Sequence, residues 1–229
     1  MIPEGAVPVL DHGFVRLDDA MATDLSVVNS ARVSFGRRKE EMDESDQGLI
    51  RFLMRERHGT PFEHNSFRFH IRAPIFVVRE WMRHRIGSFN EFSMRYARAT
   101  DDFYVPEPDD VRTQVGKPGA YSFEPVEPEL AERTREEFQA VYEQAYAAYE
   151  RLVELGVARE LARSVLPVGA YTEFYWTVNA RALMNFISLR SSESAQREIR
   201  RYAEACETFL AEKMPVTYAA FAANDRTAP

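Results

Sequence analysis

Cysteine is almost absent from this sequence, which holds a single one, Cys206, among 229 residues. One cysteine cannot form a disulfide within the chain or build a cysteine-based zinc site, so a cytoplasmic, reducing environment is expected. Long apolar runs are missing too, since none reaches the roughly 18–20 residues that span a membrane. The first residues lack the basic-then-apolar layout of a signal peptide. We therefore expect no membrane partner.

Lysine is also scarce, because 26 of the 29 basic residues are arginine and only Lys39, Lys117 and Lys213 are lysine. With such a bias a single arginine says little about function, and only clusters of arginine are informative. The formal net charge of -7 makes a general nucleic-acid binder a poor expectation, because binding to the phosphate backbone rests on excess positive charge.

What is present is typical of a folded domain, with 45% hydrophobic and 28% charged residues. We find no internal repeat and no clear linker. Short strands and long amphipathic helices alternate without the regular βα pattern of a doubly wound fold. We therefore expect one α+β domain over residues 1–223, with a mixed or antiparallel sheet flanked by long helices, and a loose tail over 224–229.

Periodicity and capping signals place the elements along the chain. Alternating apolar residues predict strands, and i, i+3, i+4 spacing predicts helices. Thr60 and Glu63 have the spacing of a capping box that starts a helix. The expected strands lie at 6–20 around a turn, 66–73, 103–108 and 171–178. The expected helices lie at 24–34, 46–57, 74–84, 128–155, 158–166, 179–190 and 194–213, and Asn179 is the expected cap of the helix that ends at Arg190. A long surface loop is expected over 106–128.

Residues 79–98 form a positive island in this acidic chain, with five arginines and one histidine against two glutamates. Arg83, His84 and Arg85 are adjacent, and three neighbouring basic groups call for a compensating anion, such as ligand phosphates. Glycine and small polar residues follow, which suit phosphate binding by backbone and side-chain donors. The alternative is a solvated basic helix end that complements the helix dipole.

A second cluster lies at 176–190. On the expected helix, Arg181, Asn185 and Ser188 form a polar stripe, whereas Arg190 shares the apolar side with Leu183 and Phe186. An arginine on an apolar face is costly unless it is paired or lines a cleft. The alternative is a frayed helix end whose arginine reaches solvent.

Other kinds of site are not supported. The five histidines have no metal-binding spacing, so we expect no metal. Glycine-rich Rossmann and P-loop motifs are absent. Cys206 has Tyr202, Phe209 and Leu210 at helical spacing, which indicates a small core residue.

Several blocks of sequence together resemble the flavin-dependent thymidylate synthases. The signature is Arg83-His84-Arg85, seven further residues and then Ser93. The stretches TPFEH at 60–64, VLP at 165–167, and WTVNARALMNF with SLR at 176–190 match the same family in the same order. The resemblance covers most of residues 10–220.

This resemblance implies a homotetramer with active sites at subunit interfaces. It implies FAD as cofactor and dUMP, methylenetetrahydrofolate and NADPH as ligands. The reaction would be reductive methylation of dUMP to dTMP with release of tetrahydrofolate, a step of thymidylate biosynthesis.

The resemblance also assigns residues. Those implied to hold FAD are His58, Thr60, Arg83, His84, Arg85, Glu91, Asn179, Arg181 and Asn185. Those implied to surround dUMP are Glu80, Trp81, Met82, Arg83, Glu91, Phe92, Ser93, Met94, Arg95, Arg163 and Arg190. Arg190 is the expected catalytic residue, because a guanidinium beside the pyrimidine would stabilise developing negative charge. Ser93 is expected to bind substrate as a hydroxyl.

Two other functions remain open from the residues alone. The first is an RNA- or nucleotide-binding module that uses the arginine island with Trp81, Phe89 and Tyr96 as stacking platforms. The second is a hydrolase with His84 as general base, which needs a partner carboxylate. Glu80 and Glu91 are the nearby candidates for that carboxylate.

Overall fold

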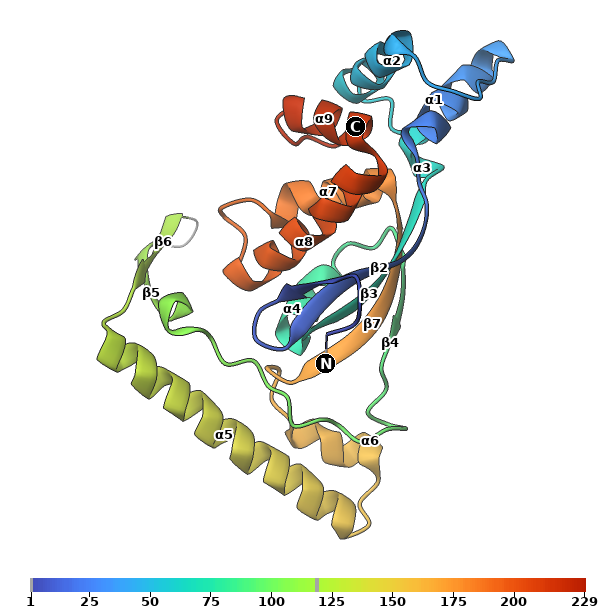
Figure 1. The fold of residues 1–229 in the computed structure, drawn as a ribbon. Helices are drawn as coiled ribbons and strands as arrows, with labels where there is room; N and C mark the ends of the chain where they lie inside the picture. Colours follow the sequence, from blue (N-terminus) through green and yellow to red (C-terminus); the bar gives the residue numbers. More distant parts are fainter. Residues whose placement is uncertain (1, 118–119) are drawn as a thin grey trace.

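The computed structural model describes residues 2–117 and 120–229, and it has the expected α+β architecture. A central antiparallel sheet carries helices α7 and α8 on one face, while the long helix α5 runs along one side of the molecule, away from the sheet (Figure 1). Helices α1 and α2 lie at the opposite end of the molecule from α5. The site described below is built at the end of the sheet where β7 leads into α7.

The sheet has five strands in the order β1-β2-β3-β7-β4, and every neighbouring pair is antiparallel. Alternation sets its two faces, because Phe67, Phe69 and Ile71 are fully buried between polar neighbours. The strands are β1 Ala6–Val9, β2 Gly13–Met21, β3 Ser66–Pro74, β4 Ser88–Glu91 and β7 Tyr171–Asn179. A separate two-stranded hairpin is formed by β5 Arg112–Lys117 and β6 Ala120–Pro125.

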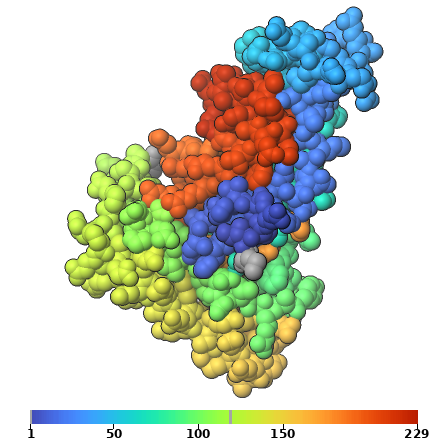
Figure 2. Space-filling view, in the orientation of Figure 1, coloured from blue at the N-terminus to red at the C-terminus, as the bar shows by residue number. Residues whose placement is uncertain are grey.

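Most helices lie on the expected segments, although α4 and α6 are shorter than expected. They are α1 Asp24–Arg32, α2 Glu44–Arg55, α3 Thr60–Glu63, α4 Ile75–Trp81, α5 Pro128–Glu154, α6 Arg159–Ala162, α7 Ala180–Arg190, α8 Arg197–Lys213 and α9 Pro215–Ala223. Short 3-10 turns occupy Val33–Phe35, Pro108–Asp110 and Arg163–Val165. Helix α9 packs against the first helices of the chain, because Asp24 accepts hydrogen bonds from the backbone of Val216 and Thr217 (Figure 2).

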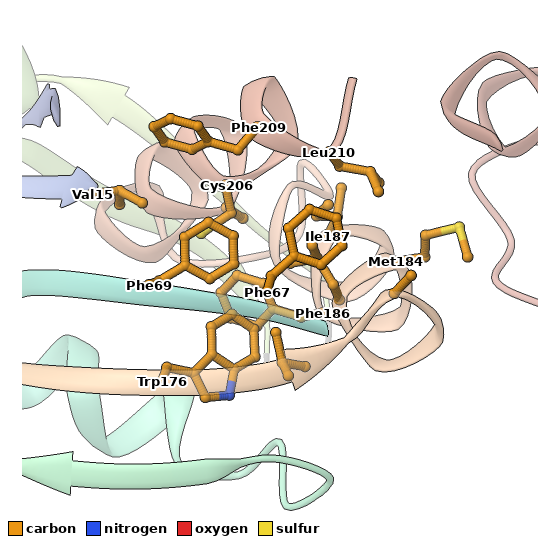
Figure 3. Close-up of a cluster of buried hydrophobic side chains, with 14 of the residues drawn as sticks. Val15, Phe67, Phe69, Trp176, Met184, Phe186, Ile187, Cys206, Phe209 and Leu210 are labelled. Atoms are coloured by element: carbon orange, nitrogen blue, oxygen red, sulfur yellow. The ribbon is translucent and has the colours of Figure 1, made fainter. Parts of the chain in front are cut away.

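The main core fills the space between the sheet and helices α7 and α8. Phe69 and Trp176 from the strands face Phe186 of α7 and Cys206 of α8 (Figure 3). Cys206 is fully buried and burial raises the pKa of its thiol well above the usual range, which confirms its expected place in the core. A smaller second cluster, which contains Tyr149 of α5, lies apart from this core. Most of α5 is exposed.

Three local expectations were wrong, and one helix was not expected. Residues 106–128 are not a plain loop, because they contain the β5–β6 hairpin, and 103–108 forms only an isolated bridge from Phe103 to Ala170. Thr60 does not cap α3, since it is already the first helical residue and Gly59 takes the capping position without a side-chain bond. The chain also resumes a helix after Met214, where a proline at the first helical position begins α9.

The last six residues, which we expected to be loose, turn back onto the protein. Arg226 pairs with Glu207 of α8, and the Asn224 side-chain amide donates to the Thr227 carbonyl. Pro229 is buried, and its carbonyl oxygen accepts a hydrogen bond from Arg181. These polar contacts give the segment a defined path that hydrophobic periodicity could not indicate. Within the described ranges, no helix is both long and apolar enough to cross a membrane.

Candidate functional site

A pocket of about 950 Å³ lies where β7 leads into α7. Its walls come from the start and the exposed side of α7, from the turn that follows α4, from the region of α3 and from the end of the chain. Six of the residues expected to hold FAD line it: Arg83, His84, Arg85, Asn179, Arg181 and Asn185. The expected catalytic residue, Arg190, lines it as well. The pocket therefore joins both sequence clusters, which lie about a hundred positions apart in the chain.

The beginning of α7 is fixed by Asn179. Its side-chain oxygen accepts from the Ala182 amide at 2.8 Å, as a helix N-cap does, and this confirms the expected cap. The Asn179 side-chain NH₂ group is not used by this bond. A helix N-terminus carries partial positive charge and unpaired amides, so the site favours an anionic ligand.

Arg181 lines the pocket, and two hydrogen bonds fix its guanidinium. Its Nη1 donates to Glu63 at 2.6 Å, and its Nε donates to the Pro229 carbonyl at 2.7 Å. Arg181 passes close to Gly59, where a Cβ would lie 2.4 Å from Arg181 Nε, so a larger residue at position 59 would displace the guanidinium. A guanidinium held in this way has a defined direction in which it can meet a ligand.

Three further arginines give the pocket its charge. Arg57, Arg83 and Arg85 line it, and none of them has an ion-pair partner among residues 2–117 and 120–229. Unpaired guanidinium groups that converge on one cavity suit phosphate, which they can bind in a bidentate manner. The exposed side chains of Ile86 and Leu189 add apolar surface on which a ring could lie.

Arg190 is held against the end of α4. Its Nε donates to His84 Nε2 at 2.9 Å, its Nη1 donates to Glu80 Oε2 at 3.1 Å, and its Nη2 donates to the Glu80 carbonyl at 3.3 Å. The Arg190 side chain is 23% exposed and that of Glu80 is 28% exposed. Arg190 is thus paired and also lines a cleft, so it meets both conditions under which an arginine is tolerated on an apolar face.

His84 is not a cation at neutral pH. Burial and, to a smaller extent, the charge of Arg190 lower the pKa of His84 to about 4. The expected set of three adjacent basic groups is therefore two arginines around a neutral imidazole. The lone pair of His84 Nε2 already accepts from Arg190, and Glu80 pairs with Arg190 instead of His84. This geometry does not favour a hydrolase that uses His84 as its base.

Six members of the expected dUMP set, residues 91–95 and Arg163, lie at the other end of the sheet. Strand β4 begins opposite Thr177 and ends opposite Phe174, so it carries the chain away from the pocket towards the start of β7. There Arg95 pairs with Glu160 of α6 at 3.2 Å, and Arg163 follows directly after α6. Glu91 accepts from Thr172 Oγ1 at 2.9 Å. We call residues 91–95 together with Arg163 the distal half-site.

Several expected contacts do not line the pocket. Trp81 is fully buried and stacks on Phe186 with ring centroids 4.6 Å apart, so its side chain belongs to the core. Met94 is buried in the second cluster. Met82 and Phe92 are partly exposed outside the pocket lining. His58 packs edge-on against Phe52. His58 and Thr60 flank Gly59 in the sequence, and Gly59 lies beside the Arg181 guanidinium.

Stacking of bases on the arginine island is also disfavoured. Of the three aromatic residues that could act as platforms, Trp81 is buried and Phe89 packs on Trp176, so only Tyr96 is well exposed. A nucleic-acid-binding module would need more than one such platform.

Some lining residues were not expected from the sequence. Glu63 was assigned to a helix cap, and no sequence signal indicates its contact with Arg181, which lies 118 positions further along the chain. Arg57 adopts the left-handed backbone conformation with φ of 58°, which no sequence signal indicates. The contributions of Ala228 and Pro229 come from the tail, for which hydrophobic periodicity gives no expectation.

Comparisons with known proteins agree on one family. The sequence model of the family described as "Thymidylate synthase complementing protein" matches residues 16–216. The flavin-dependent thymidylate synthase of Thermosipho africanus is 47% identical over 93% of this chain and 92% of its own length. The flavin-dependent thymidylate synthase of Streptomyces coelicolor is 46% identical, and the match covers 94% of this chain and 93% of that protein.

A solved structure shares the fold. The UMP/dUMP methylase PolB from Streptomyces cacaoi, bound with 5-Br dUMP, superposes with a TM-score of 0.90 at 46% identity. The match covers 97% of this chain and 100% of that one. The same methylase bound with 5-Br UMP gives a TM-score of 0.89.

Proposed function

Because this chain belongs to the flavin-dependent thymidylate synthase family, we propose that it converts dUMP to dTMP with FAD, methylenetetrahydrofolate and NADPH. The carbon from methylenetetrahydrofolate replaces the hydrogen at C5 of the pyrimidine, a hydride completes the methyl group, and tetrahydrofolate is released. The observation that carries this proposal is the pocket that joins the Arg83–Arg85 cluster to the α7 cluster.

The pocket's residues fit FAD by their chemistry. Arg83, Arg85 and Arg181 can neutralise a diphosphate, and the start of α7 adds its partial positive charge. The free NH₂ group of Asn179 and the amide of Asn185 can meet the polar edge of a heterocycle. When bound, the flavin supplies the hydride that reduces the transferred carbon.

We assign Arg190 the role of the catalytic cation. Three of its five N–H groups are used by Glu80 and His84, which leaves one N–H on each Nη for a ligand. Directed at the pyrimidine imide, these donors favour its ionised form and stabilise negative charge as it develops. The ion pair with the Glu80 carboxylate holds the Arg190 guanidinium in this position.

A covalent cysteine is not needed in this account. Cys206 is fully buried and its thiol pKa is raised, so it cannot act as a thiolate nucleophile at neutral pH. Activation of the pyrimidine then depends on the charge and the position of Arg190.

The complete site needs a second copy of the chain. Within one chain the pocket and the distal half-site lie at opposite ends of β7, a strand about 30 Å long at roughly 3.3 Å per residue. Leu130 and Val141 on α5 are 48% and 54% exposed, which leaves apolar surface for contact between copies. We therefore place dUMP between the pocket of one subunit and the distal half-site of another, within a homotetramer.

The test is a visible spectrum of the purified protein, followed by anaerobic reduction with NADPH with and without dUMP. We expect a yellow protein whose flavin absorbance is lost on reduction. Arg181→Ala should lose bound FAD and keep its fold by circular dichroism. Arg55→Ala is the control, because Arg55 is exposed, forms an ion pair with its neighbour Glu56 and lies over the Phe52 ring outside the pocket lining. A colourless wild type that cannot be reconstituted with FAD would contradict the proposal.

A further inference from the structure

Arg190 carries an unusual number of fixed contacts for a residue that must meet a substrate. All three of its nitrogens donate, two to Glu80 and one to His84, at 2.9–3.3 Å. A flexible arginine loses side-chain entropy on being fixed, and the three hydrogen bonds must offset that cost. The sequence resemblance placed Glu80 at the substrate and His84 at FAD, and neither assignment explains these three bonds.

The partners of Arg190 are themselves held by the core. The His84 ring meets Phe186 edge-on with centroids 5.0 Å apart, and Trp81 stacks on the same Phe186 ring with centroids 4.6 Å apart. Phe186 is fully buried and lies one turn before Arg190 on α7. The end of α4 is therefore locked to the end of α7, and Glu80 and His84 present fixed acceptors to the guanidinium.

The chemistry of the acceptors is complementary to the donors. Glu80 offers a carboxylate oxygen and its backbone carbonyl, and His84 offers the lone pair of Nε2. Acceptance at Nε2 requires the tautomer that carries its proton on Nδ1. A protonated His84 would have no lone pair there and would repel the guanidinium, so the arrangement needs a neutral imidazole. Among residues 2–117 and 120–229, Glu198 is the one further charged group that acts on Glu80, and it pairs with Arg112.

We propose that Glu80 and His84 are positioning residues that hold Arg190 in a single orientation, with one N–H of each Nη directed to the pyrimidine. They act in the chemical step through Arg190 and not by holding dUMP. This inference rests on the proposed function and assigns to Glu80 a role different from substrate contact. A displacement of about 1 Å in a reacting group can cost on the order of 10²-fold in rate, so loss of the Glu80 contacts should affect turnover strongly.

The first test is a double-mutant cycle on dTMP formation. Glu80→Ala should lower kcat by on the order of 10²-fold and change the KM for dUMP little. Glu80→Gln should recover most of kcat, because its side-chain oxygen can still accept from Arg190 Nη1. Adding Glu80→Ala to Arg190→Ala should cost nothing further, because the interaction through which Glu80 acts is already absent. Glu212→Ala, in an exposed pair with Lys213, is the control that should behave as wild type.

Other results would overturn the inference. If Glu80→Ala raises the KM for dUMP and the two losses multiply, Glu80 binds substrate directly. If Glu80→Ala is fully active, the contacts with Arg190 have no role. Flavin content and circular dichroism of each variant identify a mutant that has merely failed to fold. If Glu80→Ala fails to fold, the turnover of Glu80→Gln is compared with that of Glu80→Asp. Asp is too short to keep the contact and should be the less active of the two.

The second test does not depend on turnover. The pKa of His84 is followed by NMR of its ring protons in the protein without ligands. Wild type should titrate at about 4, and Arg190→Ala should raise the pKa towards its usual 6.5, since a positive neighbour is removed. An unchanged pKa in Arg190→Ala would contradict the contact. If wild type makes no dTMP but the pKa shift is observed, the proposed function fails while the positioning arrangement stands.

Discussion

Arg190 is the residue on which the proposed chemistry depends most. Removal of one preorganised charge donor typically costs on the order of 10²–10³ in rate, because its contribution is largest in the transition state. Arg190→Ala should therefore stay folded and yellow and accept electrons from NADPH, while dTMP formation drops by that factor. Arg190→Lys should recover only part of the loss, since lysine keeps the charge without the planar fork.

The measurement is dTMP production beside flavin content for both variants, with Arg55→Ala as the exposed control. If Arg190→Ala makes dTMP at the wild-type rate, Arg190 is only a helix end.

Cys206 offers the opposite prediction. It is fully buried in the core beside Phe69 and Phe186, so Cys206→Ala removes packing and nothing else (Figure 3). We expect a loss of about 1 kcal/mol in the free energy of unfolding, and turnover within a few-fold of wild type. Urea unfolding and the dTMP assay check the two parts. Complete loss of activity in a folded Cys206→Ala would identify a nucleophile that this account excludes.

Among the elements, the C-terminal segment 224–229 bears most directly on cofactor binding. The Pro229 carbonyl takes a hydrogen bond from Arg181, a residue proposed to bind FAD, and Ala228 and Pro229 line the same pocket. In a chain without residues 224–229, Arg181 Nε loses its hydrogen bond to Pro229, and the pocket loses the part of its lining that Ala228 and Pro229 form. Its affinity for FAD, measured by fluorescence titration of the apoprotein, should therefore rise. A lower affinity would mean that the segment forms part of the flavin site.

The elements that could be predicted from sequence are those with a strong local signal. β3 alternates cleanly, α5 keeps its apolar spacing over many turns, and Asn179 caps α7 as expected. The β5–β6 hairpin was missed because its residues are exposed on both faces, so no alternation marks it. Thr60 was misassigned because a capping box depends on backbone geometry that the residue types alone do not fix.

The site was predictable in part for a similar reason. Arg83–Arg85 and Arg181–Arg190 stand out as clusters, and the structure brings them together. The bonds from Arg190 to Glu80 and His84 join positions more than a hundred residues apart, and no local pattern encodes them. The neutral state of His84 follows from burial, which sequence does not reveal.

At the scale of the whole molecule, the separation of the pocket from the distal half-site predicts complementation between subunits. Arg163→Ala damages the distal half-site and Arg190→Ala damages the pocket, so each variant alone should be nearly inactive. If the two are unfolded together and refolded, some sites combine an intact pocket with an intact distal half-site. Random pairing gives activity of up to about a quarter of wild type in a symmetric oligomer.

Two variants refolded separately and then mixed without exchange provide the control for this experiment. No gain of activity in co-refolded samples that light scattering shows to be oligomeric would place each complete site within one chain.

The measurement that tests the central claim most directly is the product formed from dUMP. The purified protein with FAD is incubated with dUMP, methylenetetrahydrofolate and NADPH, and the nucleotide is analysed by mass spectrometry. We predict dTMP in proportion to the NADPH consumed, and none when either methylenetetrahydrofolate or NADPH is omitted. A flavin-bearing protein that consumes NADPH and returns dUMP unchanged would contradict the account.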